Sequence, residues 1–298
     1  MSRSKTYILL ALIGALWGFQ PITLKFLLPY WSPATITVFR FLVVGLLILL
    51  YQFMASHWQI HQILPAKRDW PWIVFMGING QMLNSVLQFH GLQFTTVTNS
   101  TLITATTPAI TAVCAFLILR EHFNGKQWLG ILLSFIGVLS IITKGDIQVL
   151  LTMHFNQGDV FCLLSQLAWA FYSLASRKLT GHLDVLTALG WCSLCGALGT
   201  LIFGLLSGTL AITILPVVPF LSYLYITLFG GIAANVFWNI GVKEVGPSVS
   251  SVFLNLTPVV GMFCGWLIFD DPMGLMQLCG AAVIFVGVYL TTHGAEHA

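Results

Sequence analysis

Two stretches of this sequence, Thr107–Val138 and Thr257–Val288, match each other at an offset of 150 residues. They read TPAITAVCAFLILREHFNGKQWLGILLSFIGV and TPVVGMFCGWLIFDDPMGLMQLCGAAVIFVGV. Each stretch contains two apolar runs with a short, more polar stretch between them. A membrane-spanning helix needs roughly 20 mostly apolar residues. Each stretch therefore predicts most of two such helices joined by a short turn, and their likeness predicts a repeated unit.

The match extends without a gap over Gly80–Val138 and Gly230–Val288, where 14 of 59 positions are identical. Apolar composition inflates chance matches of Leu and Val, but it does not readily produce a matched Thr-Pro pair and matched glycines seven residues apart. The identical pairs include Gly91/Gly241, Ser100/Ser250, Thr107/Thr257, Pro108/Pro258, Cys114/Cys264, Gln127/Gln277, Gly130/Gly280 and Gly137/Gly287. The opening spans match more weakly at an offset of 152, which pairs Trp17 with Trp169, Phe19 with Phe171 and Lys25 with Arg177.

The composition places the whole chain in a membrane. Of its 298 residues, 57% are hydrophobic and only 7% are charged, whereas a soluble domain carries roughly 25% charged residues. This excludes an ordinary soluble domain and a disordered chain, and a net charge of +3 without a basic cluster argues against a nucleic-acid partner. The runs are apolar all round rather than alternating, which favours helices over a β-barrel. The sequence predicts an all-α membrane protein with ten transmembrane helices, at Tyr7–Leu28, Pro33–Ala55, Trp70–Leu92, Thr95–Leu119, Gly125–Thr143, Gly158–Leu179, Asp184–Ser207, Pro219–Val242, Ser248–Phe269 and Met273–His293.

Five spans per repeat is an odd number, so the second repeat must lie upside down in the membrane relative to the first. We therefore expect two inverted five-helix repeats, residues 1–143 and 158–298, joined by a linker over residues 144–157. Cations gather in the segments on one side of the predicted spans, which predicts a multi-pass protein of the cytoplasmic membrane with both termini inside. The inner segments hold Arg3, Lys5, Lys67, Arg68, Arg120, Lys126, Arg177, Lys178 and Lys243, and the outer segments hold only Lys144.

The order and doubling of these motifs resemble the EamA family of the drug/metabolite transporter superfamily. The matching residues of the first half are Ala15–Phe19, Phe39–Phe41, Thr107-Pro108 with Glu121, and the Gly130/Gly137 pair, and those of the second half are Ala168–Phe171, Thr257-Pro258, Asp271 and the Gly280/Gly287 pair. Arg40 is matched by Cys192, so the two halves are not chemically equivalent. The resemblance implies an exporter in which spans one, three, four, six, eight and nine surround a central substrate cavity. Inverted repeats also suit transport by themselves, because mirror-related halves can open to either side in turn.

Polar side chains in a membrane helix should face the bundle or a wet cavity. On a wheel of 100° per residue, amides, hydroxyls and indoles fall on single faces of those same six spans, with Asn79 on the opposite side of the third. A single Ser or Thr more often joins helices than lines a path, but clustered amides beside Trp and Tyr favour a cavity for a partly apolar organic solute. The candidate substrate-binding residues are Trp17, Gln20, Gln81, Asn84, Gln88, Thr98, Thr101, Trp169, Tyr172, Asn235, Trp238, Asn239, Ser251 and Asn255.

Three candidate charge sites lie within or near the spans. Arg40 is seven residues into the second span, and Asp and Glu occur in the predicted spans only at their ends, as Asp159 does, so none lies deep in a span to pair with it. It either caps backbone carbonyls, which the peripheral place of that span in the resembled family favours, or it binds a substrate anion. Lys25 can snorkel to the outer surface or attract anions there, and His90 is either a proton site or a packing imidazole. Amides and aromatic rings without intramembrane carboxylates favour a neutral or zwitterionic solute and predict no particular coupling ion.

Pro108 and Pro258 each remove a mid-span backbone hydrogen bond, so they act as hinges or as fixed kinks. Spans five and ten carry few polar groups and keep their glycine pairs, which predicts helix packing. The sequence thus favours alternating-access transport of a small organic metabolite, with the substrate and the bilayer as partners and with no enzyme activity, cofactor or metal. An intramembrane lipid-modifying enzyme would need an acid/base or metal cluster in a span. A non-transporting membrane scaffold is the other alternative, and the oligomeric state stays open.

Overall fold

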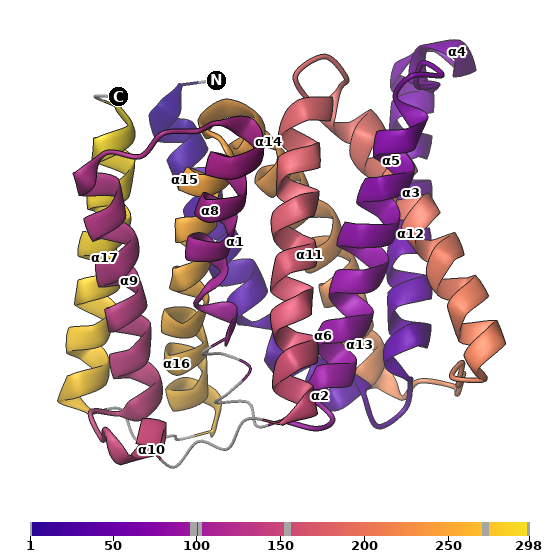
Figure 1. Ribbon diagram of the computed structural model, residues 1–298. Coiled ribbons are helices and arrows are strands. Elements are labelled where there is room, and N and C mark those ends of the chain that lie inside the picture. Colours follow the sequence, from indigo (N-terminus) through magenta and orange to yellow (C-terminus); the bar gives the residue numbers. More distant parts are fainter. Residues whose placement is uncertain (1, 96–99, 101–102, 152–155, 270–273, 297–298) are drawn as a thin grey trace.

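The computed structural model describes residues 2–95, 100, 103–151, 156–269 and 274–296, and all regular elements in these ranges are helical. The long helices run side by side between two ends of the molecule, with both termini at the same end (Figure 1). The first half contains α1 (Arg3–Gly18), α2 (Gln20–Leu27), α3 (Pro33–Ala55), α4 (Ile60–Ile63), α5 (Trp70–Met76), the π-helix η1 (Gly77–Leu83), α6 (Asn84–Gly91), α8 (Thr107–Leu119) and α9 (Gly125–Thr143). After the short α10 (Gln148–Leu151), the second half contains α11 (Gln157–Leu179), α12 (Val185–Ser207), α13 (Val217–Thr227), the π-helix η2 (Leu228–Ala233), α14 (Ala234–Val245), α15 (Pro247–Val252), the 3-10 helix η3 (Phe253–Asn255), α16 (Leu256–Phe269) and α17 (Leu275–Glu296).

Local sequence sets where several helices begin. Pro33 occupies the first turn of α3, and the Ser32 hydroxyl accepts a hydrogen bond from the Thr35 backbone N–H at 3.1 Å. Asn124 and Gln127 form a reciprocal capping box at the start of α9. Such caps satisfy backbone donors that the first turn of a helix leaves without partners. The predicted bounds of these two spans, Pro33–Ala55 and Gly125–Thr143, agree with the helices of the structure.

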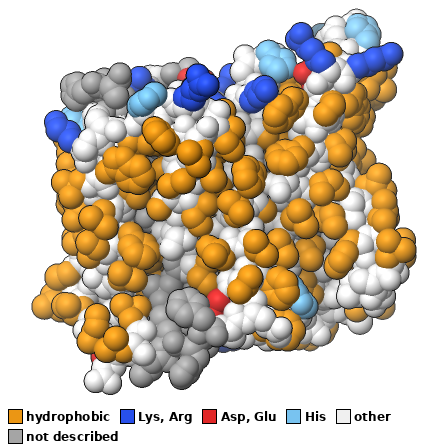
Figure 2. All heavy atoms as spheres, viewed as in Figure 1, with side chains coloured by type: hydrophobic (Ala, Val, Ile, Leu, Met, Phe, Trp, Pro, Cys, Tyr) orange, Lys and Arg blue, Asp and Glu red, His pale blue; other side chains and the backbone are white. Residues whose placement is uncertain are grey.

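Within the described ranges, eight helical stretches are long and apolar enough to cross a membrane. The third predicted span is also a continuous helical stretch, over residues 70–91, but it is not among the eight. The fourth contains α8, a shorter apolar helix of 13 residues. Figure 2 shows hydrophobic side chains over the middle of the viewed face and Lys and Arg side chains gathered near the end where the termini lie. The chain is therefore a multi-pass membrane protein.

Equivalent helices of the two halves run in opposite directions, as the predicted inverted repeat requires. In the first half, α5 lies nearer the end that carries the termini and α6 lies nearer the other end (Figure 1). In the second half the order is reversed: α13, the counterpart of α5, lies at the far end, and α14, the counterpart of α6, lies at the end that carries the termini. α9 likewise leads away from the terminal end, and its counterpart α17 leads back to it. The two π-helices occupy matching positions, since Gly80 of η1 and Gly230 of η2 are 150 residues apart.

α9 and α17 pack directly against each other through their glycines. A Cβ atom added to Gly130 would lie 2.6 Å from the Gly287 carbonyl oxygen, and one added to Gly137 would lie 2.6 Å from that of Gly280. Small residues let membrane helices approach until their backbones touch. The structure confirms that spans five and ten serve helix packing.

The two prolines lie beside breaks in the regular α-helix. Pro108 is the second residue of α8, after a turn over residues 105–106, so its position is one of the first-turn positions that have no intrahelical acceptor. Pro258 is the third residue of α16, which follows α15 and η3 without a gap, so it lies in the middle of the helical stretch Pro247–Ile268. The expected removal of a mid-span backbone donor therefore fits Pro258 and does not fit Pro108. Whether these points act as hinges stays a prediction.

Candidate functional site

Four aromatic rings from three helices meet in the middle of the bundle. Trp17 of α1 lies edge-on to Trp169 of α11, with ring centroids 5.3 Å apart, and 5.9 Å from Trp238 of α14. The Trp169 and Trp238 rings are 5.2 Å apart, and Tyr172 stacks on Trp169 at 5.0 Å. Trp238 and Tyr172 are fully buried. The cluster joins one helix of the first repeat to two helices of the second and brings four of the predicted site residues together, whose role in binding stays a prediction.

Amide side chains extend this cluster along α14. Asn239 donates from Nδ2 to the Tyr172 hydroxyl at 2.8 Å and to the Asn235 carbonyl oxygen at 2.7 Å, and its Oδ1 accepts from the hydroxyls of Tyr172 and Ser176. The Asn235 Nδ2 donates to the carbonyl oxygens of Gly230 and Gly231 in η2. Asn239 is thus held by four hydrogen bonds, which gives it a structural role in addition to any contact with a solute.

The Gly230 carbonyl of η2 accepts three hydrogen bonds from different parts of the fold. The donors are the Trp17 indole at 3.0 Å, an Arg40 Nη atom at 3.0 Å and the Asn235 amide at 3.1 Å. A π-helix changes the regular hydrogen-bond ladder, and π-helices often occur at functional sites. Arg40 also donates to Gln20 Oε1 at 3.3 Å, and its guanidinium carbon lies 5.1 Å from the centroid of the Phe41 ring. Arg40 therefore caps a carbonyl, as one of its two interpretations expects.

Several polar atoms of the predicted site have no partner. Among the described residues, nine buried side-chain N and O atoms lack a hydrogen bond, and five of them belong to predicted site residues. These are Arg40 Nε, Trp169 Nε1, Asn235 Oδ1, Trp238 Nε1 and Asn255 Nδ2. Leaving a buried donor or acceptor unpaired costs about 1–3 kcal/mol, so a cluster of such atoms indicates groups kept for a ligand or water.

The π-helix η1 changes the face that the third span presents. Asn84 donates to the Ser165 carbonyl oxygen at 3.0 Å, and Asn79 donates to that of Ala168 at 2.6 Å, so both amides contact α11. Gln81 instead lies 3.8 Å from the Cys192 sulfur of α12. A regular wheel puts Asn79 opposite Asn84, and this is wrong because a π-helix has more residues per turn. The role of Gln81, Asn84 and the half-buried Gln88 in binding stays a prediction.

The remaining predicted residues are more scattered. Ser251 is buried and donates to the Ser248 carbonyl oxygen at 2.7 Å. Lys25 and His90 are exposed, and the His90 ring lies edge-on to Phe94 and Phe161. Thr98 and Thr101 lie outside the described residues.

The sequence did not single out two buried groups near the site. Gln166 accepts from the Thr107 hydroxyl at 2.7 Å and donates to that of Ser165 at 2.9 Å, so it joins α8 to α11. The second is the Gly230 carbonyl. The identity of Gly230 with Gly80 is the sequence feature that indicates a special backbone position in both repeats.

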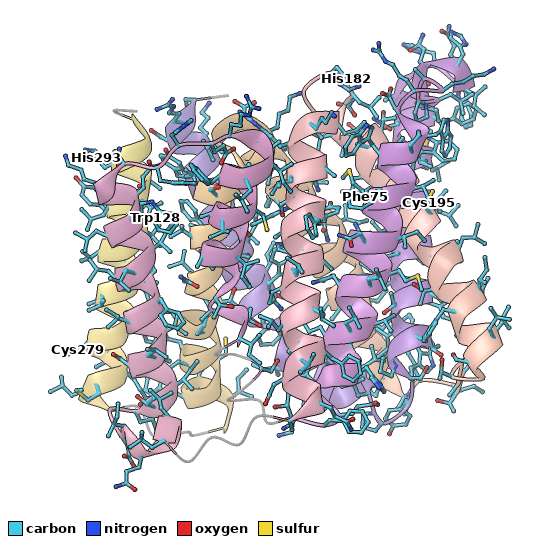
Figure 3. All side chains as sticks on the ribbon, viewed as in Figure 1. Phe75, Trp128, His182, Cys195, Cys279 and His293 are labelled. Carbon is cyan, nitrogen blue, oxygen red and sulfur yellow. The ribbon has the colours of Figure 1, made fainter. Side chains whose placement is uncertain are left out.

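Polar groups at the end that carries the termini connect the two halves. Glu121, just after α8, accepts a hydrogen bond from the Ser248 hydroxyl of α15 at 2.8 Å. Burial raises the pKa of the Glu121 carboxyl, whereas the hydrogen bond from Ser248 and the charge of Arg177 lower it by a smaller amount. His182 lies at this end (Figure 3), 2.9 Å from the Asp69 carboxylate. These last two residues belong to a surface pocket of about 390 Å³, whose other lining residues are Arg68, Trp72, Lys178 and Leu179.

Comparison with known proteins gives consistent matches over the full length. The model of the EamA-like transporter family matches twice, at residues 5–143 and 156–293. The uncharacterized transporter YyaM of Bacillus subtilis is 29% identical over 295 residues, which cover 99% of this chain and 95% of that protein. An uncharacterized transporter of Archaeoglobus fulgidus is 24% identical over 97% of this chain and 98% of its own length. A solved crystal structure matches the whole of both chains with a TM-score of 0.80 and 16% sequence identity, which shows a shared fold.

Proposed function

The chain belongs to the EamA-like transporter family, and we propose that it moves a small organic metabolite across the cell membrane by alternating access, in the export direction. In this proposal the third and fourth predicted spans complete the eight apolar ones to ten. Both termini are cytoplasmic, because the cation-rich end in Figure 2 is the end that carries them. The two inverted repeats move relative to each other around the central aromatic cluster.

The observation that carries the proposal is the central cluster itself. Trp169, Trp238 and Asn255 hold buried N–H groups without partners, and Asn235 holds a buried carbonyl oxygen without one. The two indole donors lie in the aromatic cluster, and Asn235 is connected to it through Asn239 and the Gly230 carbonyl, which is the arrangement of a site for a partly apolar solute with a few polar groups. Helix packing alone would favour satisfied or apolar side chains at these positions.

In this proposal, contacts between the halves at the terminal end form one gate of the transport cycle. Glu121 of the first half accepts from Ser248 of the second. Within the second half, Arg177 donates to the Val242 carbonyl oxygen at 3.1 Å and to that of Lys243, which fixes α11 to the end of α14. In the proposed cycle, opening toward the cytoplasm breaks the Glu121–Ser248 contact.

Two measurements test the proposal. Purified protein in detergent is screened against metabolites for a rise in thermal midpoint, because a bound solute stabilises the folded state by mass action. The compound that raises it most is then followed into proteoliposomes. We expect uptake above empty vesicles, and uptake that Trp169→Phe and Trp238→Phe reduce by about tenfold or more, which corresponds to about 1.4 kcal/mol.

Trp128→Phe is the matched control, since Trp128 projects from α9 and is 43% exposed (Figure 3). Each site variant also removes part of a buried ring, so the thermal midpoint of the unliganded protein should fall, and flux and ligand shift are therefore compared at equal amounts of folded protein. Flux and ligand shift at the level of the Trp128→Phe control in both variants would contradict the assignment of the site. A lack of flux for every stabilising solute would contradict the transport proposal itself.

A further inference from the structure

We propose that Arg40 forms the anion-binding end of the central site and that the solute is a small organic monoanion, with one carboxylate on Arg40 and an apolar or aromatic body against the three indoles. This inference rests on the proposed function and names the substrate class of the same site. Arg40 lies in α3, outside the aromatic cluster. Its repeat counterpart in the second half is Cys192, which carries no charge.

Among the described residues, no acidic side chain forms an ion pair with Arg40. The residue is only 5% exposed, and its guanidinium contacts a backbone carbonyl, an amide and an aromatic ring. The described acidic residues of the long helices lie near helix ends, such as Asp159 in the first turn of α11 and Glu244 at the penultimate position of α14. A charge held at membrane depth without a carboxylate partner is costly and marks a functional site by default.

The donors of Arg40 are only partly used. One Nη atom donates to the Gly230 carbonyl oxygen and to Gln20 Oε1, while Nε is buried without an acceptor. A carboxylate binds a guanidinium through two parallel N–H groups. The Gln20 contact is the longer of the two, at 3.3 Å, and the Gln20 side chain is only half-buried. In the proposed complex, a solute carboxylate replaces Gln20 Oε1 and also accepts from Nε.

Gly230 of η2 borders this guanidinium. A Cβ atom added to Gly230 would lie 3.0 Å from Gln20 Oε1 and 3.5 Å from an Arg40 Nη atom. One added to Gly231 would lie 3.5 Å from Arg40 Nε but only 2.7 Å from Val44 Cγ2, so that position is closely packed. A side chain at Gly230 would therefore lie against the Arg40 donors and against the Gln20 oxygen that the solute carboxylate replaces.

The anion site and the aromatic cluster share one backbone group. Trp17 donates to the Gly230 carbonyl oxygen that Arg40 also contacts, and the Trp17 ring continues to Trp169 and Trp238. A solute with a carboxylate at one end and a flat apolar body can therefore reach both. A fixed positive charge on the solute would find no carboxylate among the residues described at this depth, which favours a monoanion over a zwitterion.

A matched pair of fluorinated probes tests the proposal: 4-fluorophenylacetate and its neutral amide, 4-fluorophenylacetamide. Their affinities for the purified protein in detergent are measured at pH 7 by fluorine NMR line broadening. For the wild-type protein we expect the acid to bind about tenfold more tightly than the amide, because only the acid forms a charge-assisted pair with Arg40. Arg40→Gln should bring this ratio close to one while the amide still binds. Arg40→Lys should give an intermediate ratio, since it keeps the charge and loses the Nε donor.

Lys126→Gln is the control for general attraction of anions, because it removes an exposed cation of α9, outside the predicted path. It should leave the acid-to-amide ratio unchanged. Equal binding of acid and amide by the wild-type protein, an unchanged ratio in the Arg40 variants, or an equal loss in Lys126→Gln would overturn the proposal. If Arg40→Gln does not fold, the wild-type ratio and Arg40→Lys decide. Solute flux together with a wild-type ratio of one would overturn this inference alone, whereas the proposed function fails only if no solute is moved.

Discussion

Each half of the molecule reaches across to the π-helix of the other half, and the two contacts differ in chemistry. Arg40 of α3 donates to the Gly230 carbonyl oxygen of η2, whereas its repeat counterpart Cys192 of α12 lies 3.8 Å from the Gln81 amide of η1. The first contact brings a charge and an unpartnered donor to the middle of the bundle. The second joins a free thiol to an amide. One duplicated position has thus become a candidate binding site in one half and a packing contact in the other.

The backbone around the two π-helices shows the same difference. A Cβ atom added to Gly77 of η1 would lie 2.5 Å from the Cys192 carbonyl oxygen, so η1 is pressed against α12. One added to Gly80 would meet the Tyr172 ring. At Gly230 of η2 the nearest atom is instead the end of the Gln20 side chain, although the next residue, Gly231, packs closely on Val44. η1 is therefore fixed by close packing at both of its glycines, whereas η2 combines close packing at Gly231 with hydrogen bonds at Gly230.

The largest expected difference is in stability, between alanine substitutions at the matched glycines Gly80 and Gly230. In Gly80→Ala the new Cβ would lie 2.1 Å from Tyr172 Cδ2 and 2.7 Å from Tyr172 Cβ, so the core must shift. Overpacking of this kind costs about 1–3 kcal/mol. Gly230→Ala meets only Gln20 Oε1 at 3.0 Å, which a rotation of that side chain relieves. Thermal unfolding in detergent should show a clear loss for Gly80→Ala and a small one for Gly230→Ala, and equal losses would contradict the contrast between η1 and η2.

The next largest difference is expected in the free energy of unfolding, between substitutions of one amide in each half. Asn239→Leu removes four hydrogen bonds around Tyr172, Ser176 and the Asn235 carbonyl, whereas Asn84→Leu removes one bond to a backbone carbonyl. Side-chain hydrogen bonds in membrane proteins contribute on average about 0.6 kcal/mol each. We therefore expect a loss of about 2 kcal/mol for Asn239→Leu and less than about 1 kcal/mol for Asn84→Leu. Unfolding in a denaturing detergent measures both, and the reverse order would show that the second-half network is not the stronger one.

The sequence predicted the repeat and most helix ranges because apolar runs, prolines and capping residues act locally. The start of α3, for example, follows directly from Ser32 as the capping residue and Pro33 in the first turn. The pairing of Arg40 was not predictable, since its partner is a backbone carbonyl 190 residues away that only the tertiary fold brings near.

The two π-helices could not be predicted from the sequence, for a different reason. A helical wheel assumes one constant angle per residue, and η1 breaks that assumption within the third span. Asn79 therefore shares a face with Asn84, although the wheel separates them. The predicted aromatic residues came together because Trp17 and Trp169 are repeat counterparts at the same depth. Thr98 and Thr101 stay predictions, since they lie outside the described residues.

The smallest expected effect concerns pH at the contact between the halves. Burial raises the pKa of the Glu121 carboxyl above its ordinary value of 4.5, so the folded protein binds this proton more readily than the unfolded chain does. The free energy of unfolding should therefore rise slightly as pH falls through the raised pKa toward 4.5, and this contribution should not change further below that value.

Glu121→Gln should remove this contribution while keeping an acceptor for the Ser248 hydroxyl. Ser248→Ala should move it to higher pH, because the hydrogen bond from Ser248 lowers the pKa. Thermal midpoints between pH 4 and 8, taken as wild type minus variant, measure the difference, and profiles that run parallel throughout would show that Glu121 does not couple proton binding to the contact with α15.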